Sequence, residues 1–299
     1  MTLIELIESG AAKFTRAQLA FGHGTTNAFD ESAWLVLWCL GMPLDTALDG
    51  AESMQNMPIA PMDIDRCAML FEARIETRKP AAYLTHEAWL QGVSFYVDER
   101  VIVPRSLIAE LLADGSIDYW LRETARSVLD LCTGNGSLAI LAALSHPDMD
   151  VVGADLSRDA LAVARINVDT HELQGRITLV ASDGLAATEL QERAPFDLIL
   201  CNPPYVNAQS MAQLPPEYLA EPAMALDGNR SGGSDGMDFI RTLIQQAPQC
   251  MAPGAVLVLE IGNERHHFEA AFPRLEVVWL ETSAGCDQVL VVTREALIQ

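Results

Sequence analysis

Apolar residues recur along the first quarter of the chain with the spacing that is typical of amphipathic helices. Residues 30–40 and 63–74 place apolar side chains at positions i, i+3 and i+4, so each segment predicts a helix with one buried face. Asp30 and Asp63 stand at the starts of these segments and are expected to cap them. We therefore expect residues 1–75 to form a small helical domain.

Residues 76–103 change to short segments that are rich in aromatic and β-branched residues. Two of these segments, residues 80–84 and 93–97, predict strands of a hairpin or linker. A helical pattern over residues 105–113 follows. The sequence thus predicts a hairpin linker and then a second domain that occupies residues 104–299.

From residue 127 onward, short apolar strands alternate with helical segments. Strands are predicted for residues 127–131, 150–154, 177–181, 196–201, 255–261, 275–280 and 288–293, and helices for residues 138–144, 159–171 and 238–251. This alternation predicts the α/β class, with a mostly parallel, doubly wound, Rossmann-like sheet covered by helices on both faces. Ligands of such sheets bind beyond the carboxyl ends of the strands, so polar residues that follow strands are candidates for a site.

Composition narrows the class of protein. The 299 residues, half of them hydrophobic and a fifth charged, suit one large or two modest folded domains. No apolar stretch of about 18 residues occurs, so no membrane span is expected, and early acids favour a first helix over a signal peptide. Six widely spaced cysteines without zinc-type spacing favour reduced thiols in the cytoplasm.

The net charge of −22 also bears on the partner. Such a charge repels nucleic acid, and no cluster of Lys or Arg offsets it, so no direct nucleic-acid partner is expected. The charge would attract a basic partner, although it equally suits solubility alone.

A glycine-rich turn lies between the first strand and the first helix of the second domain. It reads Thr133-Gly134-Asn135-Gly136-Ser137. Its glycines allow positive φ and close approach of a ligand, and the helix start offers unpaired N–H groups. Asp155 follows the next strand and is placed to accept hydrogen bonds from ribose hydroxyls. Asp183 follows the third strand and could receive an adenine amine or cap a turn.

This segment alone leaves the ligand open. The same glycines with Asp155 nearly fit the dinucleotide fingerprint, so NAD and S-adenosylmethionine are both compatible with it. A glycine turn without any ligand is the third alternative.

Asn202-Pro203-Pro204-Tyr205 ends the apolar strand at residues 196–201. Two prolines cannot continue a strand and fix a stiff turn. The side-chain oxygen of Asn202 and the carbonyl of Pro203 could hold the two N–H groups of an amide or aromatic amine, while Tyr205 stacks on its plane. These contacts would aim a poor nitrogen nucleophile at an electrophilic methyl group and favour its developing positive charge. The alternative is a simple turn.

Taken in order, Asp130 to Ser137, Asp155, Asp183 and Asn202 to Tyr205 resemble the motifs of class I methyltransferases. The chain resembles the HemK/Prm family of protein N5-glutamine methyltransferases along nearly its whole length. Within that family it is most similar to the branch that acts on large-subunit ribosomal protein three. The closer similarity rests on residues 21–28, on Pro104-Arg105-Ser106, and on residues 214–218 with Glu221-Pro222.

The resemblance implies a cytoplasmic enzyme that uses S-adenosylmethionine to methylate a glutamine side-chain nitrogen. The substrate would be a basic ribosomal protein, free or in early assembly, docked by the helical domain, and no metal is implied. The cofactor would be bound by Asp130, Cys132, Thr133, Gly134, Asn135, Gly136, Asp155, Asp183, Gly184 and Asn202. Asn202, Pro203 and Tyr205 would be catalytic, with Pro204 and Glu221 joining them in binding the substrate.

Two departures from the family pattern stand out. Cys132 occupies the position where many members have the first glycine of the loop, and residues 229–234 resemble a small insertion. We interpret the insertion as a tolerated surface loop. Arg105 could anchor a charged end of the cofactor or substrate, but we favour a pair with a surface acid. Trp34 and Trp38 are interpreted as parts of a helical core.

Four rival functions remain. Methylation of release factors would differ only in the protein substrate. A DNA adenine-N6 methyltransferase would act on a similar NH₂ group, but base flipping needs basic and aromatic surfaces. An NAD-dependent oxidoreductase is disfavoured by Asn-Pro-Pro-Tyr. A non-catalytic binding module would have lost motif residues, and none is lost.

Overall fold

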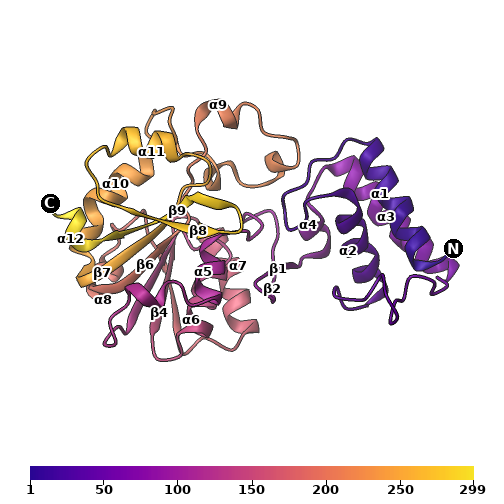
Figure 1. Ribbon diagram of the computed structural model, residues 1–299, viewed down its shortest axis with the longest axis horizontal. Helices are drawn as coiled ribbons and strands as arrows, with labels where there is room; N and C mark the ends of the chain where they lie inside the picture. Colours follow the sequence, from indigo (N-terminus) through magenta and orange to yellow (C-terminus); the bar gives the residue numbers. More distant parts are fainter. The chain divides into compact units, whose positions relative to one another are not determined.

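The computed structural model describes all 299 residues, which separate into two compact units (Figure 1). One unit comprises Met1–Ala88 together with Leu214–Glu221, and the other comprises Trp89–Gln213 and Pro222–Gln299. The chain therefore leaves the second unit after residue 213, contributes eight residues to the first unit and returns. None of the helices has the length and apolarity that crossing a membrane requires.

The first unit is helical. Its helices are α1 (Leu3–Arg16), α2 (Ala28–Leu40), α3 (Pro61–Thr77) and α4 (Ala81–Thr85), and the inserted segment adds the 3₁₀ turn η2 (Tyr218–Ala220). The predicted caps are wrong in both cases. Asn27 caps α2, because its side chain accepts a hydrogen bond from the backbone of Asp30. α3 has no side-chain cap and begins at Pro61, two residues before Asp63, because proline suits the first position of a helix.

The predicted strand at residues 80–84 is also wrong, because α4 occupies this segment. Two alanines and a tyrosine of α4 are buried, and alanine has the highest helix propensity, so a short helix forms after Pro80. The hairpin instead consists of β1 (Ala88–Leu90) and β2 (Val93–Phe95), joined at Gln91 and Gly92, which both have positive φ. The first unit thus extends past residue 75 and takes in α4.

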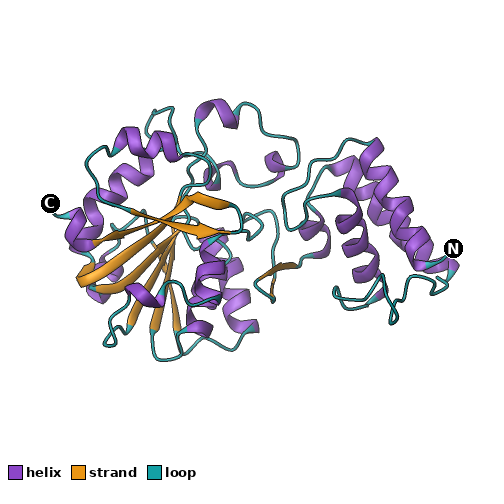
Figure 2. Ribbon diagram, viewed as in Figure 1, coloured by secondary structure: helices purple, strands orange, loops and turns teal.

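The second unit is built on a seven-stranded sheet (Figure 2). In spatial order its strands are β5 (Ile177–Ala181), β4 (Asp150–Asp155), β3 (Ser127–Leu131), β6 (Phe196–Cys201), β7 (Met251–Glu260), β9 (Gly285–Thr293) and β8 (Val278–Thr282). The first five are parallel, and β9 runs antiparallel to both of its neighbours. The predicted α/β class with a mainly parallel sheet is confirmed.

Helices cover both faces of this sheet. Alternate residues of each strand enter two separate apolar cores, as the twofold repeat of a strand requires. One core receives α5 (Ile108–Ala113), α6 (Ser137–Ser145) and α7 (Arg158–Thr170), and the other receives α8 (Thr188–Arg193), α10 (Asp238–Gln246) and α11 (Arg265–Ala271). The remaining short elements are η1 (Asp118–Trp120), α9 (Ala208–Met211), η3 (Ala223–Ala225), η4 (Ala247–Gln249) and α12 (Arg294–Leu297).

The late elements begin and end away from their predicted positions. α10 ends at Gln246 instead of residue 251, because Pro248 lacks the N–H that another helical turn would need. β7 starts at Met251, before the predicted residue 255, and β8 starts at Val278, after the predicted residue 275.

The order of the strands fixes where a ligand can bind. β3 has β4 on one side and β6 on the other, so the direction in which the chain builds the sheet reverses between β3 and β6. Crevices form at the carboxyl ends of strands at such a switch point. The glycine loop follows β3, and Asn202 follows β6, so both motifs start at this crevice.

Candidate active site

The loop after β3 turns sharply through three residues with positive φ. These are Cys132 at 63°, Gly134 at 56° and Gly136 at 82°, and a cysteine in this region is uncommon. A Cβ atom on Gly136 would lie 3.2 Å from Cβ of Ala164, so glycine lets α7 pack closely there. A Cβ atom on Gly134 would meet no protein atom within 4 Å, so Gly134 faces open space.

Asp130 lies beneath this loop and is fully buried. Its Oδ2 atom accepts hydrogen bonds from Oγ1 of Thr133 at 2.5 Å and from the backbone N–H of Ala139 at 2.9 Å. Burial raises the pKa of the Asp130 carboxyl to about 7. Asp130 therefore fixes the loop to the first turn of α6.

Asn135 and Gly136 also shape the loop from within. The side-chain oxygen of Asn135 accepts a hydrogen bond from the N–H of Ser137, and its backbone carbonyl accepts one from the amide of Asn167. Asn167 exchanges two further hydrogen bonds with the backbone of Tyr96. Sequence reasoning missed Asn167, which ties α7, the loop and the segment after β2 together.

Asp155 ends β4 and faces the same loop. Its two oxygens accept hydrogen bonds from the backbone N–H groups of Gly134, at 2.9 Å, and Ser157, at 2.8 Å. Burial raises the pKa of the Asp155 carboxyl, and the backbone donors and Arg230 act in the opposite direction. Each oxygen keeps a lone pair for a further donor.

A pocket opens at these strand ends and contains about 700 Å³ of empty space, including its mouth. Seven of the predicted site residues line it, namely Cys132, Gly134, Asp155, Asp183, Gly184, Asn202 and Pro204. The side chain of Asp183 is exposed and forms no hydrogen bond, so Asp183 does not cap a turn. The ring of Phe239, which the sequence did not indicate, supplies an apolar wall beside Gly184. The pocket has the size of a small-ligand site.

The other seven predicted residues do not line the pocket, and two of them, Pro203 and Tyr205, belong to the corner after β6 that is described below. Asp130, Thr133, Asn135 and Gly136 support the loop from behind, and Glu221 belongs to the helical unit. In that unit the buried carboxylate of Glu221 lies 3.5 Å from Nε2 of the buried His23. Its neighbour Pro222 belongs to the second unit and does line the pocket.

The corner after β6 presents two oxygen atoms that the protein leaves unused. The side chain of Asn202 is half-buried, lines the pocket and forms no hydrogen bond within the protein. The carbonyl of Pro203 likewise accepts no hydrogen bond, although Pro203 and Pro204 are both buried. Neither proposed acceptor therefore has a partner within the protein, and the side chain of Asn202 lines the pocket.

Tyr205 is held in place by two glycines. A Cβ atom on Gly262 would lie 2.6 Å from Cε2 of the Tyr205 ring, so the ring packs directly on the backbone after β7. A Cβ atom on Gly236 would lie 2.0 Å from the Tyr205 carbonyl oxygen. Neither glycine carried a recognisable signal in the sequence, because each acts through a residue far along the chain.

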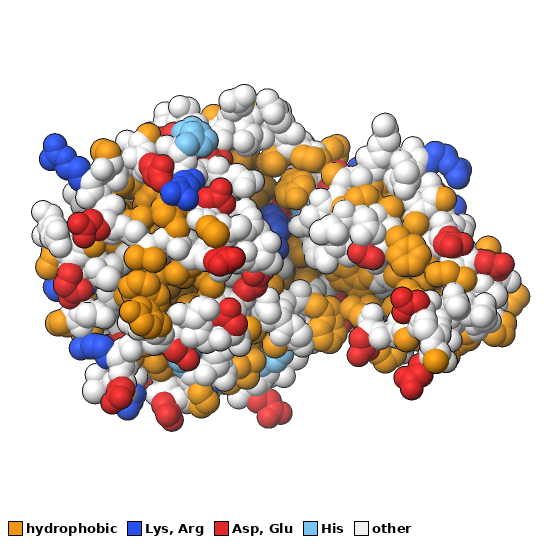
Figure 3. All heavy atoms as spheres, in the orientation of Figure 1, with side chains coloured by type: hydrophobic (Ala, Val, Ile, Leu, Met, Phe, Trp, Pro, Cys, Tyr) orange, Lys and Arg blue, Asp and Glu red, His pale blue; other side chains and the backbone are white.

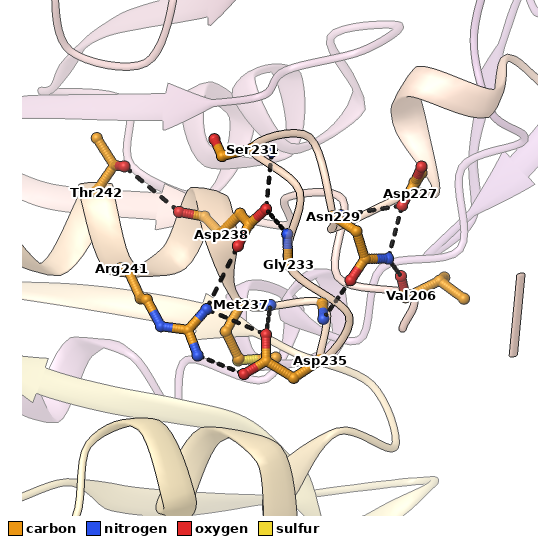
Figure 4. Close-up of polar contacts among 11 residues, drawn as sticks. Val206, Asp227, Asn229, Ser231, Gly233, Asp235, Met237, Asp238, Arg241 and Thr242 are labelled. Atoms are coloured by element: carbon orange, nitrogen blue, oxygen red, sulfur yellow. Dashed lines mark hydrogen bonds and ion pairs between the residues drawn. The ribbon is translucent and has the colours of Figure 1, made fainter. Parts of the chain in front are cut away.

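The segment after Tyr205 is braced by the loop at residues 226–238 (Figure 4). The backbone of Val206 exchanges hydrogen bonds with Leu226 and Gly228, and the amide of Asn229 also donates to the Val206 carbonyl at 3.0 Å. Asp238 accepts hydrogen bonds from the N–H groups of Ser231 and Gly233. The loop is thus built by its own side chains.

This loop corrects one expectation. Residues 229–234 were expected to form a surface loop without a role, but Arg230 within them lines the pocket and its charge acts on Asp155. Arg230 is exposed and forms no hydrogen bond or ion pair within the protein. The hydrogen bonds of Asn229 and Ser231 fix the backbone on either side of it.

Two buried carboxylates near the strand ends were also missed by sequence reasoning. Glu264 accepts a hydrogen bond from the amide of Asn207 at 2.7 Å, which ties the start of α9 to the segment after β7. Glu260, at the end of β7, accepts hydrogen bonds from Oγ of Ser106 at 2.5 Å and from the N–H of Leu107. Burial raises the pKa of the Glu260 carboxyl to about 7.

Arg105 differs from its expected role. Its guanidinium donates to the carbonyl of Val103, and its charge also lowers the pKa of the buried Glu260. The Pro-Arg-Ser segment therefore braces the start of α5 against the end of β7.

Comparisons with known proteins identify the family of this chain. Residues 117–234 match the Methyltransferase small domain family. A ribosomal protein uL3 glutamine methyltransferase from Burkholderia pseudomallei is 50% identical and covers 97% of this chain and 94% of that protein. One from Bordetella pertussis is 48% identical and covers 99% of this chain and 96% of that protein.

A solved structure is similar in fold. The catalytic domain of hMettl16, in complex with MAT2A 3′UTR hairpin 1, aligns with a TM-score of 0.53 at 14% identity. The alignment covers 82% of this chain and 84% of that one. At this identity the similarity concerns the fold alone.

Proposed function

Since the chain belongs to the family of ribosomal protein uL3 glutamine methyltransferases, we propose that it methylates the side-chain amide nitrogen of a glutamine in ribosomal protein uL3. The chain is an enzyme, and its methyl donor is S-adenosylmethionine, as the class I methyltransferase fold and these relatives imply. When bound, this cofactor supplies an electrophilic methyl group on a sulfonium ion, which is a good leaving group.

The pocket residues fit this cofactor. The open space above Gly134 admits a ligand against the backbone, and the remaining lone pairs of Asp155 suit a ribose diol. Asp183 is available to an adenine amine, and the ring of Phe239 supplies an apolar surface for the base. We assign the cofactor to this pocket on these grounds.

The single observation that carries the proposed reaction is the pair of unused acceptors at Asn202 and Pro203. An amide nitrogen is a poor nucleophile, because its lone pair is delocalised into the carbonyl group. Two acceptors that bind its two N–H groups would orient the nitrogen and stabilise the positive charge that it gains on methylation. Both acceptors already stand in place on a rigid corner, so little reorganisation is needed.

The ring of Tyr205 would lie against the plane of the glutamine amide. Its contact with Gly262 fixes the ring on one side and leaves no room for a displaced position there. Because the methylated amide sheds a proton after transfer, the reaction needs no strong general base.

We further propose that the enzyme acts in the cytoplasm on uL3 that is free or in early assembly. The net charge of −22 attracts a basic protein and disfavours direct binding to nucleic acid. The RNA phosphates on the surface of a finished ribosomal subunit would repel this charge.

The test is transfer of labelled methyl groups to purified candidate substrates, with the modified residue located by mass spectrometry. We expect one methylated glutamine in uL3 and no transfer to release factors or to DNA. Transfer to a release factor in preference to uL3 would overturn the substrate, and transfer to DNA adenine would overturn the amide chemistry. The Asn202→Ala variant serves as the control for transfer at this site.

A further inference from the structure

The helical unit carries an apolar groove that the methyl-transfer reaction does not use. We name it the α2 groove. It is lined by Phe29, Asp30, Ala33, Trp34, Leu37, Leu44 and Leu48. These residues come from α2 and the loop after it, and the groove contains about 530 Å³ of empty space, part of it open to solvent. Phe29 and Leu44 are 37% and 36% exposed, so an apolar surface remains uncovered.

Trp34 gives the groove an unmet polar requirement. Its side chain is buried, at 8% exposure, yet its indole N–H has no acceptor in the protein. Buried indole N–H groups normally have an acceptor, because leaving one unpaired costs free energy. The far edge of the same ring packs on Gly24 and so is fixed. The Trp34 ring is therefore a fixed wall of the groove.

The charge around the groove has one sign. Residues 17–65 contain seven Asp or Glu residues and no Lys or Arg. Asp45 and Asp49 directly follow the groove residues Leu44 and Leu48, are exposed, and form no hydrogen bond or ion pair. On the face in Figure 3, red acidic side chains are scattered among orange apolar ones over the helical unit. An apolar surface edged by unpaired acids complements an apolar segment edged by cations.

We propose that the α2 groove binds a segment of the protein substrate in which apolar side chains are flanked by Lys or Arg. This proposal rests on the proposed function for the identity of the substrate as uL3. The apolar side chains would fill the groove, and the flanking cations would face Asp45 and Asp49. The groove would select the protein, while the pocket in the other unit acts on the glutamine.

The experiment compares two substrates of the full-length enzyme. One is intact uL3, and the other is a short peptide that contains only the methylated glutamine and its neighbours. In the double variant Asp45→Lys/Asp49→Lys we expect KM for intact uL3 to rise roughly tenfold with unchanged kcat. KM for the short peptide should stay the same, because the peptide lacks the docking segment.

A second variant and a matched control separate docking from general charge. Leu44→Ser removes an exposed apolar wall without a change of charge and should raise KM for intact uL3 but not for the peptide. Asp148→Lys/Glu192→Lys makes the same charge change at exposed residues of the other unit and should leave both values unchanged. Equal rises in the two lysine variants, or no rise in the groove variants, would overturn the proposal.

Failure of the proposed function can be distinguished from failure of the proposed docking in the α2 groove. If the unmodified enzyme methylates neither substrate, the function is wrong, while calorimetric affinities of intact uL3 for the same variants still judge the groove. Loss of affinity in the groove variants alone would support docking, and equal affinity in all of them would exclude it.

Discussion

Two sets of buried charged residues, one in each unit, are held in opposite ways. In the helical unit, the fully buried Arg74 lies between two carboxylates, 2.6 Å from Glu31 and 3.8 Å from Glu217, and Arg78 also pairs with Glu217 at 3.1 Å. In the methyltransferase unit, Asp130 and Glu260 are buried without any ion pair, held by hydroxyl and N–H donors. Burial raises the pKa of each to about 7.

The difference shows what each arrangement is suited to do. Paired charges fix one segment to another, and Glu217 lies in the segment that the second unit lends to the first. Lone carboxylates fix turns close to the site but make their surroundings sensitive to pH. Asn202 and Arg230, which have no partner within the protein, both line the pocket.

The largest effect is expected in the helical unit. Glu217→Ala removes a buried partner of Arg74 and Arg78, which should lower the free energy of unfolding by about 3 kcal/mol. Glu72→Ala, which breaks a solvent-exposed pair with Lys13, should cost less than about 1 kcal/mol. Denaturant unfolding of both variants measures the contrast, and equal losses would contradict the role of the buried network.

Asn202→Ala tests the opposite case, in which a side chain without partners serves only the ligand. We expect kcat to fall by about 100- to 1,000-fold, which corresponds to about 3–4 kcal/mol of transition-state stabilisation. The free energy of unfolding should change by less than about 0.5 kcal/mol, because no hydrogen bond within the protein is lost. Full turnover with normal cofactor binding would refute the amide clamp.

Gly262→Ala probes the packing under Tyr205. The new methyl group would collide with the ring, so we expect a loss of about 1–3 kcal/mol in unfolding free energy together with a raised KM for the protein substrate. Gly41→Ala is the matched control, since Gly41 also has positive φ but faces open space. Gly41→Ala should lower the unfolding free energy through backbone strain, but it should leave KM for the protein substrate unchanged.

Glu260→Gln tests the pH sensitivity of the lone carboxylates. The folded protein keeps a proton on Glu260 up to a pKa of about 7, whereas the unfolded chain releases it near the ordinary value of 4.5. Glu260 therefore contributes stability that is fully present below pH 4.5 and is lost as the pH rises through 7. The variant should flatten the decline in unfolding free energy between about pH 5 and pH 8 by on the order of 2 kcal/mol. Parallel pH curves for the two proteins would contradict the assignment.

Arg230→Gln should give the smallest effect. Removing the cation lets the pKa of Asp155 rise further, so Asp155 takes up a proton more readily in mild acid. We expect affinity for S-adenosylmethionine to fall about twofold at acidic pH and to change little in mild base. Calorimetric titration measures both values, and Arg193→Gln, which breaks an exposed pair with Glu189, is the control.

The fold was predictable where local sequence decides the structure. β3, β5 and β6 begin and end where the apolar runs do, because strands buried on both faces are continuous apolar segments. The glycine loop and the diproline corner were recognisable because both turns depend on residues that stand next to each other. The relatives confirm the family that these motifs predicted, and with it the enzyme class and the cofactor.

The rest depends on pairs that are distant in the sequence. Glu217 is buried by Arg74 and Arg78, and the ring of Tyr205 by the backbone at Gly262, so neither environment is visible from neighbouring residues. Arg230 lies in an insertion whose shape comes from hydrogen bonds of Asn229 and Asp238. The roles of the individual site residues stay a prediction, which the variants above test.

The excursion of Leu214–Glu221 has a practical consequence for anyone who wishes to divide this protein. A protease that cuts only after Ala88 would release no helical fragment, because residues 1–88 stay bound to Leu214–Glu221, which belong to the rest of the polypeptide. A gene shortened to the first 88 codons would produce helices with a buried guanidinium lacking one of its two counterions. The helical unit should therefore be studied within the full-length chain and not as an isolated fragment.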